Sequence, residues 1–145
     1  MMNVIGDEDI GHQEYDPNIS NPLFILASCP VASRPEGTPR LWGNIKINVK
    51  PGSLAYRIYR QDEIVEPYSC NFEMNPGYKE ILEKRGVKIS GTTENRITSI
   101  IELPDRTFYI ATAYQPQLSS EESNPHPLIA AYLEAVINHK KVKAE

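Results

Sequence analysis

The stretch from Phe108 to Tyr132 constrains the fold more than any other part of the chain. It reads F-Y-I-A-T-A-Y-Q-P-Q-L-S-S-E-E-S-N-P-H-P-L-I-A-A-Y. Aromatic and β-branched residues over Thr107–Tyr114 predict a strand. Pro127–Lys141 then predicts a helix, because five residues recur at helical spacing: Leu128, Ala131, Tyr132, Ala135 and Val136. We therefore expect a strand with a polar end, a loop, and a final helix whose stripe packs on the sheet.

Earlier segments predict further strands, each bounded by turn residues: Leu23–Ser28, Ile45–Val49, Ile64–Met74, Val87–Ser90 and Thr98–Leu103. The first of these is a continuous apolar run, which favours a strand buried on both faces. Pro67 excludes a central ladder position within the third. Pro104-Asp105 turns the chain after the fifth, so that strand should form a hairpin with Thr107–Tyr114.

Two short helices are expected between the strands. Ser53 is placed to cap one that ends at Tyr59. Pro76–Arg85 predicts the other, because proline stands at its start and Gly86 follows as the stop. Strands interspersed with helices favour an α/β architecture.

Six motifs, in order, resemble the glutamine amidotransferase domain of CTP synthase. They are E-D-I-G-H-Q-E-Y, G-N-I-K-I-N, S-L-A-Y-R-I-Y, I-V-E-P-Y-S-C-N-F-E-M-N, the pair of segments Gly86–Gly91 and Ile97–Glu102, and Y-Q-P-Q followed by P-H-P-L. The likeness extends over roughly residues 4 to 140, and it is greatest to a branch described as related to the CTP synthase C-terminal region. The resemblance implies an α/β, flavodoxin-like class I glutamine amidotransferase sandwich, whose mixed sheet has an antiparallel edge.

The resemblance also shows what this chain does not contain. The family's nucleophile elbow, G-x-C-x-G, precedes the matching region and has no counterpart here. Cys29 stands in A-S-C-P and Cys70 in Y-S-C-N, so neither has the glycines that a strained strand-to-helix turn requires. Residues 1–145 are therefore interpreted as one partial domain, the C-terminal half.

Four positions match residues to which the family gives a role. The resemblance places Gln115 at the catalytic His, Gln117 at the Glu that orients it, Asn71 at an Arg ligand of the substrate carboxylate, and Glu14 at a Glu that contacts glutamine. A neutral amide cannot act as a general base near pH 7, and an amide cannot reproduce a bidentate Arg–carboxylate contact. Each of the four is either a ligand-binding residue or an ordinary polar loop residue.

Cys70 has two interpretations: a nucleophile with His12 as its base, or a small buried strand cysteine. We expect it to be buried. His126, in P-H-P-L, is expected to fix the entry to the last helix. Three dispersed histidines give no metal-ligand spacing, and no phosphate-binding glycine motif is present, so we expect no metal and no cofactor.

Composition excludes some partners. A net charge of −4 argues against nucleic-acid binding, which needs a basic face. No run approaches the ~18 apolar residues of a membrane span. The acidic start M-M-N-V-I-G-D-E-D does not resemble a signal peptide. Two cysteines make no disulfide framework, so a cytoplasmic location is expected.

Three functional hypotheses remain open. The chain could be a binding or assembly module without glutaminase activity by itself, half of a split CTP synthase-like amidotransferase, or an enzyme of altered chemistry that uses Cys70. Half of an α/β domain would leave strand edges unpaired. We therefore expect a homo-oligomer or a separate chain that supplies the N-terminal half, and a small-molecule ligand remains possible.

Overall fold

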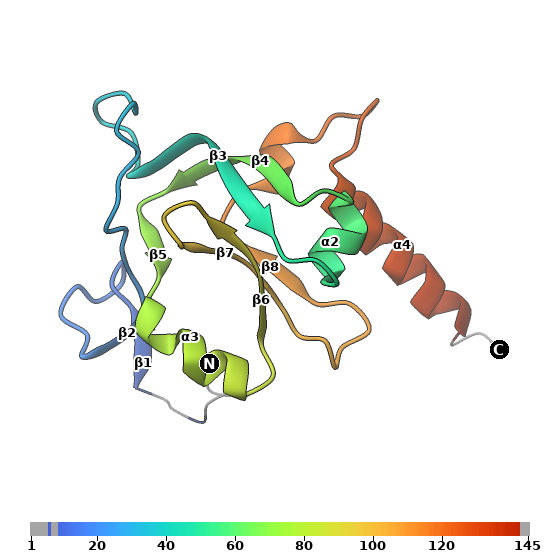
Figure 1. Ribbon diagram of the computed structural model, residues 1–145, viewed down its shortest axis with the longest axis horizontal. Coiled ribbons are helices and arrows are strands. Elements are labelled where there is room, and N and C mark those ends of the chain that lie inside the picture. Colours follow the sequence, from blue (N-terminus) through green and yellow to red (C-terminus); the bar gives the residue numbers. More distant parts are fainter. Residues whose placement is uncertain (1–5, 7–8, 143–145) are drawn as a thin grey trace.

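The computed structural model describes Gly6 and residues 9–142, without the side chain of Val142 (Figure 1). The acidic start M-M-N-V-I-G-D-E-D, which was not expected to be a signal peptide, lies mostly outside the described residues. Two sheets and three helices make up the described part. A five-stranded sheet has the order β4-β3-β6-β7-β8, and a three-stranded sheet has the order β1-β2-β5. The fold is α/β, with a mixed small sheet, as the resemblance implied.

All strand pairs of the five-stranded sheet are antiparallel. Its members are β3 (Leu41–Val49), β4 (Glu63–Cys70), β6 (Lys88–Thr93), β7 (Thr98–Glu102) and β8 (Ile110–Thr112). The expected hairpin of the last two strands is confirmed, although β8 is shorter than the sequence suggested. β4 and β8 are the two edges, so Pro67 lies on an edge strand as expected.

The small sheet joins the first two strands of the chain to β5, which comes from the middle of the sequence. β1 (Ile10–His12) pairs in parallel with β2 (Asn21–Leu26), which pairs antiparallel with β5 (Phe72–Met74). The expectation that the β2 segment is buried on both faces is wrong. Phe24 and Leu26 are 37% and 49% exposed, because no element of the described chain covers that face of β2 completely.

Local sequence explains the two short helices. Ser53 Oγ accepts a hydrogen bond from the Tyr56 N–H at 2.9 Å, so it caps α2 (Leu54–Tyr59) as expected. The expected helix over Pro76–Arg85 consists of a 3₁₀ turn, Pro76–Tyr78, and α3 (Lys79–Lys84). Gly86 ends it with a φ of 86°, a conformation that glycine adopts without strain.

The last helix, α4 (Pro127–Val142), does not pack as the sequence suggested. Leu128 packs against the main core, but Tyr132 and Val136 are 54% and 47% exposed. The contacts of α4 with α2 use the side that carries the alanines, and Figure 1 shows its C-terminal end extending away from the sheets. The main core lies instead over the long sheet, around Leu41, Ile47, Tyr68 and Ile100.

Candidate functional site

The outer edge of β4 is occupied by the polypeptide that follows β8. In the β3–β4 ladder, residues of β4 alternate between bonding β3 and pointing away from it. The Val49 N–H donates to Asp62 O, so Pro67 and Ser69 direct their backbone groups outward. The Gln115 N–H donates to Pro67 O at 3.1 Å. The Gln115 side chain accepts from the Ser69 N–H at 2.9 Å, so this amide fixes the strand edge.

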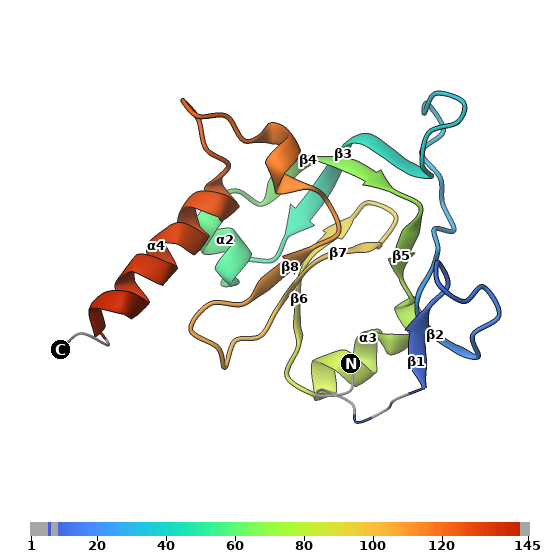
Figure 2. The ribbon, with the colours of Figure 1, turned by 180° about the vertical axis from the view of Figure 1, so that it is seen from behind.

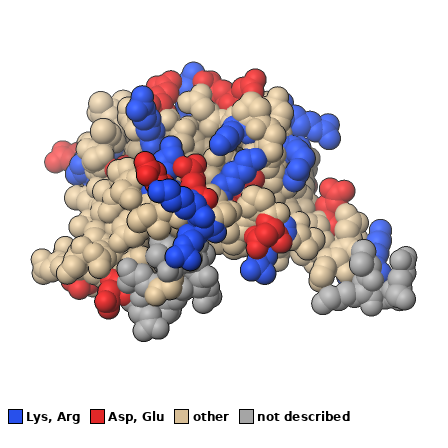
Figure 3. All heavy atoms as spheres, turned by 60° about the horizontal axis from the view of Figure 1, so that its bottom comes forward, with Lys and Arg blue, Asp and Glu red and all other residues tan. Residues whose placement is uncertain are grey.

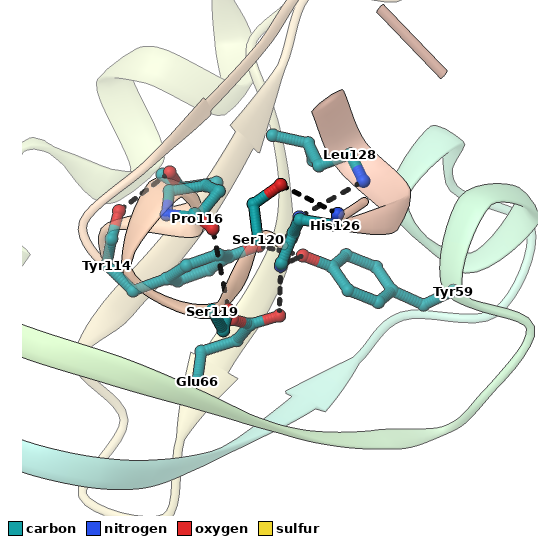
Figure 4. Close-up of polar contacts among 9 residues, drawn as sticks. Tyr59, Glu66, Tyr114, Pro116, Ser119, Ser120, His126 and Leu128 are labelled. Carbon is teal, nitrogen blue, oxygen red and sulfur yellow. Dashed lines mark hydrogen bonds and ion pairs between the residues drawn. The ribbon is translucent and has the colours of Figure 1, made fainter. Parts of the chain in front are cut away.

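A buried polar network lies next to this contact (Figure 4). His126 Nε2 and Glu66 Oε1 are 2.9 Å apart, and the two side chains are only 4% and 5% exposed. Tyr59 Oη lies 3.5 Å from the same nitrogen and 2.8 Å from Tyr114 Oη. Four segments thus meet at one point: β4, α2, the end of the β8 segment and the start of α4.

The network explains the sharp entry to α4. His126 Nδ1 accepts a hydrogen bond from the Leu128 N–H at 3.2 Å, and the Ser120 hydroxyl accepts one from the His126 N–H at 3.1 Å. The expectation that His126 fixes the start of the last helix is confirmed. Burial raises the pKa of both the Tyr59 and the Tyr114 hydroxyls, so both stay protonated at neutral pH and either can donate the hydrogen bond that they share.

A third tyrosine continues the polar layer under β4. Tyr68 is 2% exposed, and its hydroxyl donates to Ser99 Oγ at 2.6 Å. Burial raises the pKa of Tyr68 to about 12. Its ring lies 6.0 Å from the ring of Tyr114. The tyrosines therefore join β4 to both β7 and the segment after β8.

Gln117 does not share the environment of Gln115. It lies in a 3₁₀ turn, Pro116–Ser119, and its side chain is exposed. The contacts of Gln115 with β4 involve no part of Gln117. The two glutamines therefore do not form a joint site in this conformation.

Asn71 and Cys70 are held by local backbone contacts. Asn71 Oδ1 accepts from the Arg40 N–H at 2.9 Å. Cys70 Sγ lies 3.4 Å from both the N–H and the carbonyl of Phe72. The cysteine is half-buried rather than buried as expected, and it stands at the end of the edge strand β4.

Glu14 takes no part in the β4 contacts of Gln115. Its side chain is exposed, and its N–H donates to His12 Nδ1 at 3.0 Å. The His12 ring stacks on Phe24 at 4.9 Å and meets Phe72 edge-on at 4.8 Å. With Nδ1 engaged by Glu14, the structure gives no Cys70–His12 pair among the described residues.

The structure thus brings Gln115 into contact with Ser69, next to Cys70 and Asn71. Glu14 is connected to this part of the chain only through the rings of His12 and Phe72. Gln117 takes part in neither contact. Sequence reasoning missed Glu66 and Tyr59, which form the buried network with His126. Glu66 lies in the edge strand β4, on the face that also buries Ile64 and Tyr68. A charged residue on the apolar face of a strand is the sequence signal that could have indicated a buried polar partner.

The chemical capacity of this site is limited. Among the described residues, no three His, Cys, Asp or Glu side chains come together as a metal site. The backbone N–H and the side-chain oxygen of Gln115 both bond to the backbone of β4. Figure 3 shows acidic and basic side chains on the same face, interspersed among uncharged residues. Within the described chain, no helix is long and apolar enough to cross a membrane.

Comparison with known proteins gives consistent matches, although no family model matches the chain. The CTP synthase of Saccharolobus solfataricus is 35% identical over 134 residues, which are 92% of this chain and 25% of that protein. The CTP synthase of Staphylococcus saprophyticus is 35% identical over 143 residues, 97% of this chain and 26% of that protein. The chain therefore spans about a quarter of the length of these curated relatives.

Solved structures agree with this. The glutaminase domain of Trypanosoma brucei CTPS, solved with bound acivicin, superposes with a TM-score of 0.82 at 22% identity, over 94% of this chain and 54% of that one. A protein from Thermoplasma acidophilum described as a GMP synthase subunit gives a TM-score of 0.57 at 13% identity, over 84% and 52%. By sequence and by fold, this chain belongs to the CTP synthase glutamine amidotransferase-like family.

Proposed function

We propose that this chain is a CTP synthase-type glutamine amidotransferase-like module that has no glutaminase activity by itself and acts in binding or assembly. Its residues 1–145 constitute a partial domain, the C-terminal half, and it works in the cytoplasm. The proposal concerns this chain alone, because it spans about a quarter of the length of its CTP synthase relatives.

The geometry of Gln115 is the observation that carries the proposal. In the family resemblance this position belongs to the base that activates the nucleophile. A glutamine side chain has no proton-accepting group near neutral pH. Here its Oε1 accepts from the Ser69 N–H, and its backbone N–H donates to Pro67. A residue that anchors a strand edge in this way supports a structural role at this position.

The neighbouring candidates support the same conclusion. Asn71 is neutral, and its side-chain oxygen is engaged by Arg40. An enzyme of altered chemistry would need Cys70 as a thiolate, which requires a nearby cation or base. The contacts of Cys70 are with the backbone of Phe72, which supplies neither. Glu14 and Gln117 are exposed and remain available to a small-molecule ligand.

An assay of ammonia release from L-glutamine tests the proposal. We expect the purified chain to release no more ammonia than the same protein after heat inactivation. The Cys70→Ser and Cys29→Ser variants serve as matched controls, because they remove the two thiols separately. Release above background that Cys70→Ser removes and Cys29→Ser retains would contradict the proposal and establish the enzyme hypothesis.

Iodoacetamide labelling separates the two hypotheses independently of any substrate. A half-buried thiol without a stabilising charge should react slowly at neutral pH. We expect exposed Cys29 to be labelled before Cys70. Rapid, stoichiometric labelling of Cys70 with Cys29 spared would instead identify an activated nucleophile.

A further inference from the structure

A groove lies between α2 and α4, apart from the Gln115 contacts. Figures 1 and 2 both show the short helix α2 lying against α4. The groove has a volume of about 490 Å³, which is within the ~300–1,000 Å³ range of small-molecule sites. None of its lining residues takes part in the bonds of Gln115 or in the buried network of Tyr59, Glu66 and His126. The proposed function therefore leaves this groove without a role.

Small side chains on α4 leave the space open. Ala130, Ala131 and Ala135 line the groove on the side of α4 that turns to α2. Ile58 of α2 and Phe108, just before β8, add larger apolar surfaces. An apolar molecule that covers these side chains is removed from water together with them, which favours its binding.

Two arginines at the end of α2 give the groove its charge. Arg57 lies in the last turn of the helix and Arg60 directly follows it, and both line the groove. Within the described chain, neither guanidinium group makes an ion pair or a hydrogen bond. The lining holds one carboxylate, that of Glu134 on α4, so the groove is positive although the whole chain has a net charge of −4. This charge suits an anionic ligand.

Arg60 has a backbone conformation that favours glycine. Its φ and ψ are 55° and 33°, and its N–H donates to Tyr56 O at 2.8 Å, which closes the end of α2. Glycine is the usual residue at such a helix end, because a β-carbon makes the left-handed conformation less favourable. An arginine here costs stability while its side chain lines the groove. Strained residues of this kind concentrate at binding sites, so Arg60 is a second indication of a ligand.

We propose that the groove between α2 and α4 binds a small organic anion, whose carboxylate or phosphate group contacts Arg57 and Arg60 and whose apolar body lies over Phe108 and the alanines. A guanidinium group is a planar fork whose N–H donors match two oxygens of either anion. Apolar walls exclude water and strengthen this contact. Glu134, on the α4 side of the groove, repels a second anionic group, so the ligand carries a single one.

Titration with four matched compounds tests the proposal. The probes are 1-naphthoate and 1-naphthyl phosphate. The controls are 1-naphthol, which lacks the anion, and inorganic phosphate, which lacks the apolar body. Added to the isotope-labelled full chain and followed by NMR, both probes should shift the amide signals of Ala131 and Ala135 saturably. Their dissociation constants should be lower than those of either control by about tenfold or more, because each control loses one of the two kinds of contact.

Arginine variants locate the anion. Arg57→Gln and Arg60→Gln should each weaken binding of 1-naphthoate by about tenfold or more, because each removes a charged donor. Arg60→Gly should also lose binding, yet keep or raise the melting temperature, since glycine adopts the left-handed conformation without strain. This variant separates a ligand contact from a folding defect. Arg85→Gln is the matched control, because exposed Arg85 ends α3 outside the groove, and it should leave binding unchanged.

The outcomes distinguish the alternatives. Binding of one probe without the other would support the site and identify the anion, carboxylate or phosphate, that it recognises. Binding of 1-naphthol as tight as that of 1-naphthoate would reveal an unspecific apolar surface and overturn the proposal. Unchanged affinity in the Arg57 and Arg60 variants, or no shift at Ala131 and Ala135 with either probe, would overturn it as well. These results do not depend on glutamine hydrolysis, so they leave the proposed function to its own test.

Discussion

The two edges of the five-stranded sheet differ in how their outward backbone groups are bonded. On β4, Pro67 has no N–H to offer, Gln115 bonds its carbonyl, and the Gln115 side chain accepts the next outward N–H, from Ser69. On β8, the outward groups of Ile110 and Thr112 meet no strand of the described chain. The Pro67–Ser69 part of the β4 edge is closed against further pairing, whereas the β8 edge is open in the described chain.

The largest effect on stability is expected from the buried pair of His126 and Glu66, next to the β4 edge. His126→Ala removes the partner of Glu66, whose side chain is 5% exposed, and also the acceptor for the Leu128 N–H. Loss of one member of a buried pair costs about 3 kcal/mol or more in the free energy of unfolding. Urea denaturation would measure it. A loss below about 1 kcal/mol would show that the network does not hold β4 to α4.

Alkaline pH tests the same side of the molecule. Burial raises the pKa of Tyr68 from 10.0 to about 12. Below pH 10 the hydroxyl is protonated in both the folded and unfolded chain, so its contribution to stability is complete. Above pH 10 the unfolded chain ionises first, so stability falls as pH rises through 12. Denaturation series from pH 8 to the alkaline limit should show this decline, and Tyr68→Phe should make it shallower. A flat profile would contradict burial of the tyrosines.

A smaller effect is expected for the residue that closes β4. Gln115→Ala leaves the Ser69 N–H to water, since Ser69 is exposed, and should lower the free energy of unfolding by about 1 kcal/mol. Gln117→Ala is the control and should change nothing measurable, because Gln117 is exposed on the neighbouring turn. Equal effects of the two substitutions would remove the distinction between the two glutamines.

The smallest effect should occur on the open side. Tyr132 is 54% exposed, so Tyr132→Asp should change the stability of the free chain by only about 0.5 kcal/mol. Thermal denaturation measures the effect. A strong loss of free-chain stability would show that α4 docks through Tyr132 on its own body.

The sequence predicted the elements that depend on local chemistry. Ser53 caps its helix, Gly86 ends another, Pro67 marks an edge and Pro104-Asp105 begins the turn of a hairpin. Each of these outcomes depends on a few neighbouring residues.

Burial was predicted less well, because it depends on what lies across space. Leu26 and Val136 have the pattern of core residues, yet both are exposed when the chain stands alone. The Glu66–His126 pair joins residues 60 positions apart, which no local pattern reveals. The motif resemblance identified the family, but only the fold shows that the Gln115 amide bonds to the β4 edge.

Amide hydrogen exchange of the free chain tests the difference between the two edges most directly. The Ser69 N–H on β4 is bonded to Gln115, whereas the Thr112 N–H on β8 points away from β7, the strand with which β8 pairs in the described part of the chain. After correction for intrinsic rates, we predict that Thr112 exchanges at least about tenfold faster than Ser69. Equal protection of the two amides would contradict the account, because β8 would then be as closed as β4.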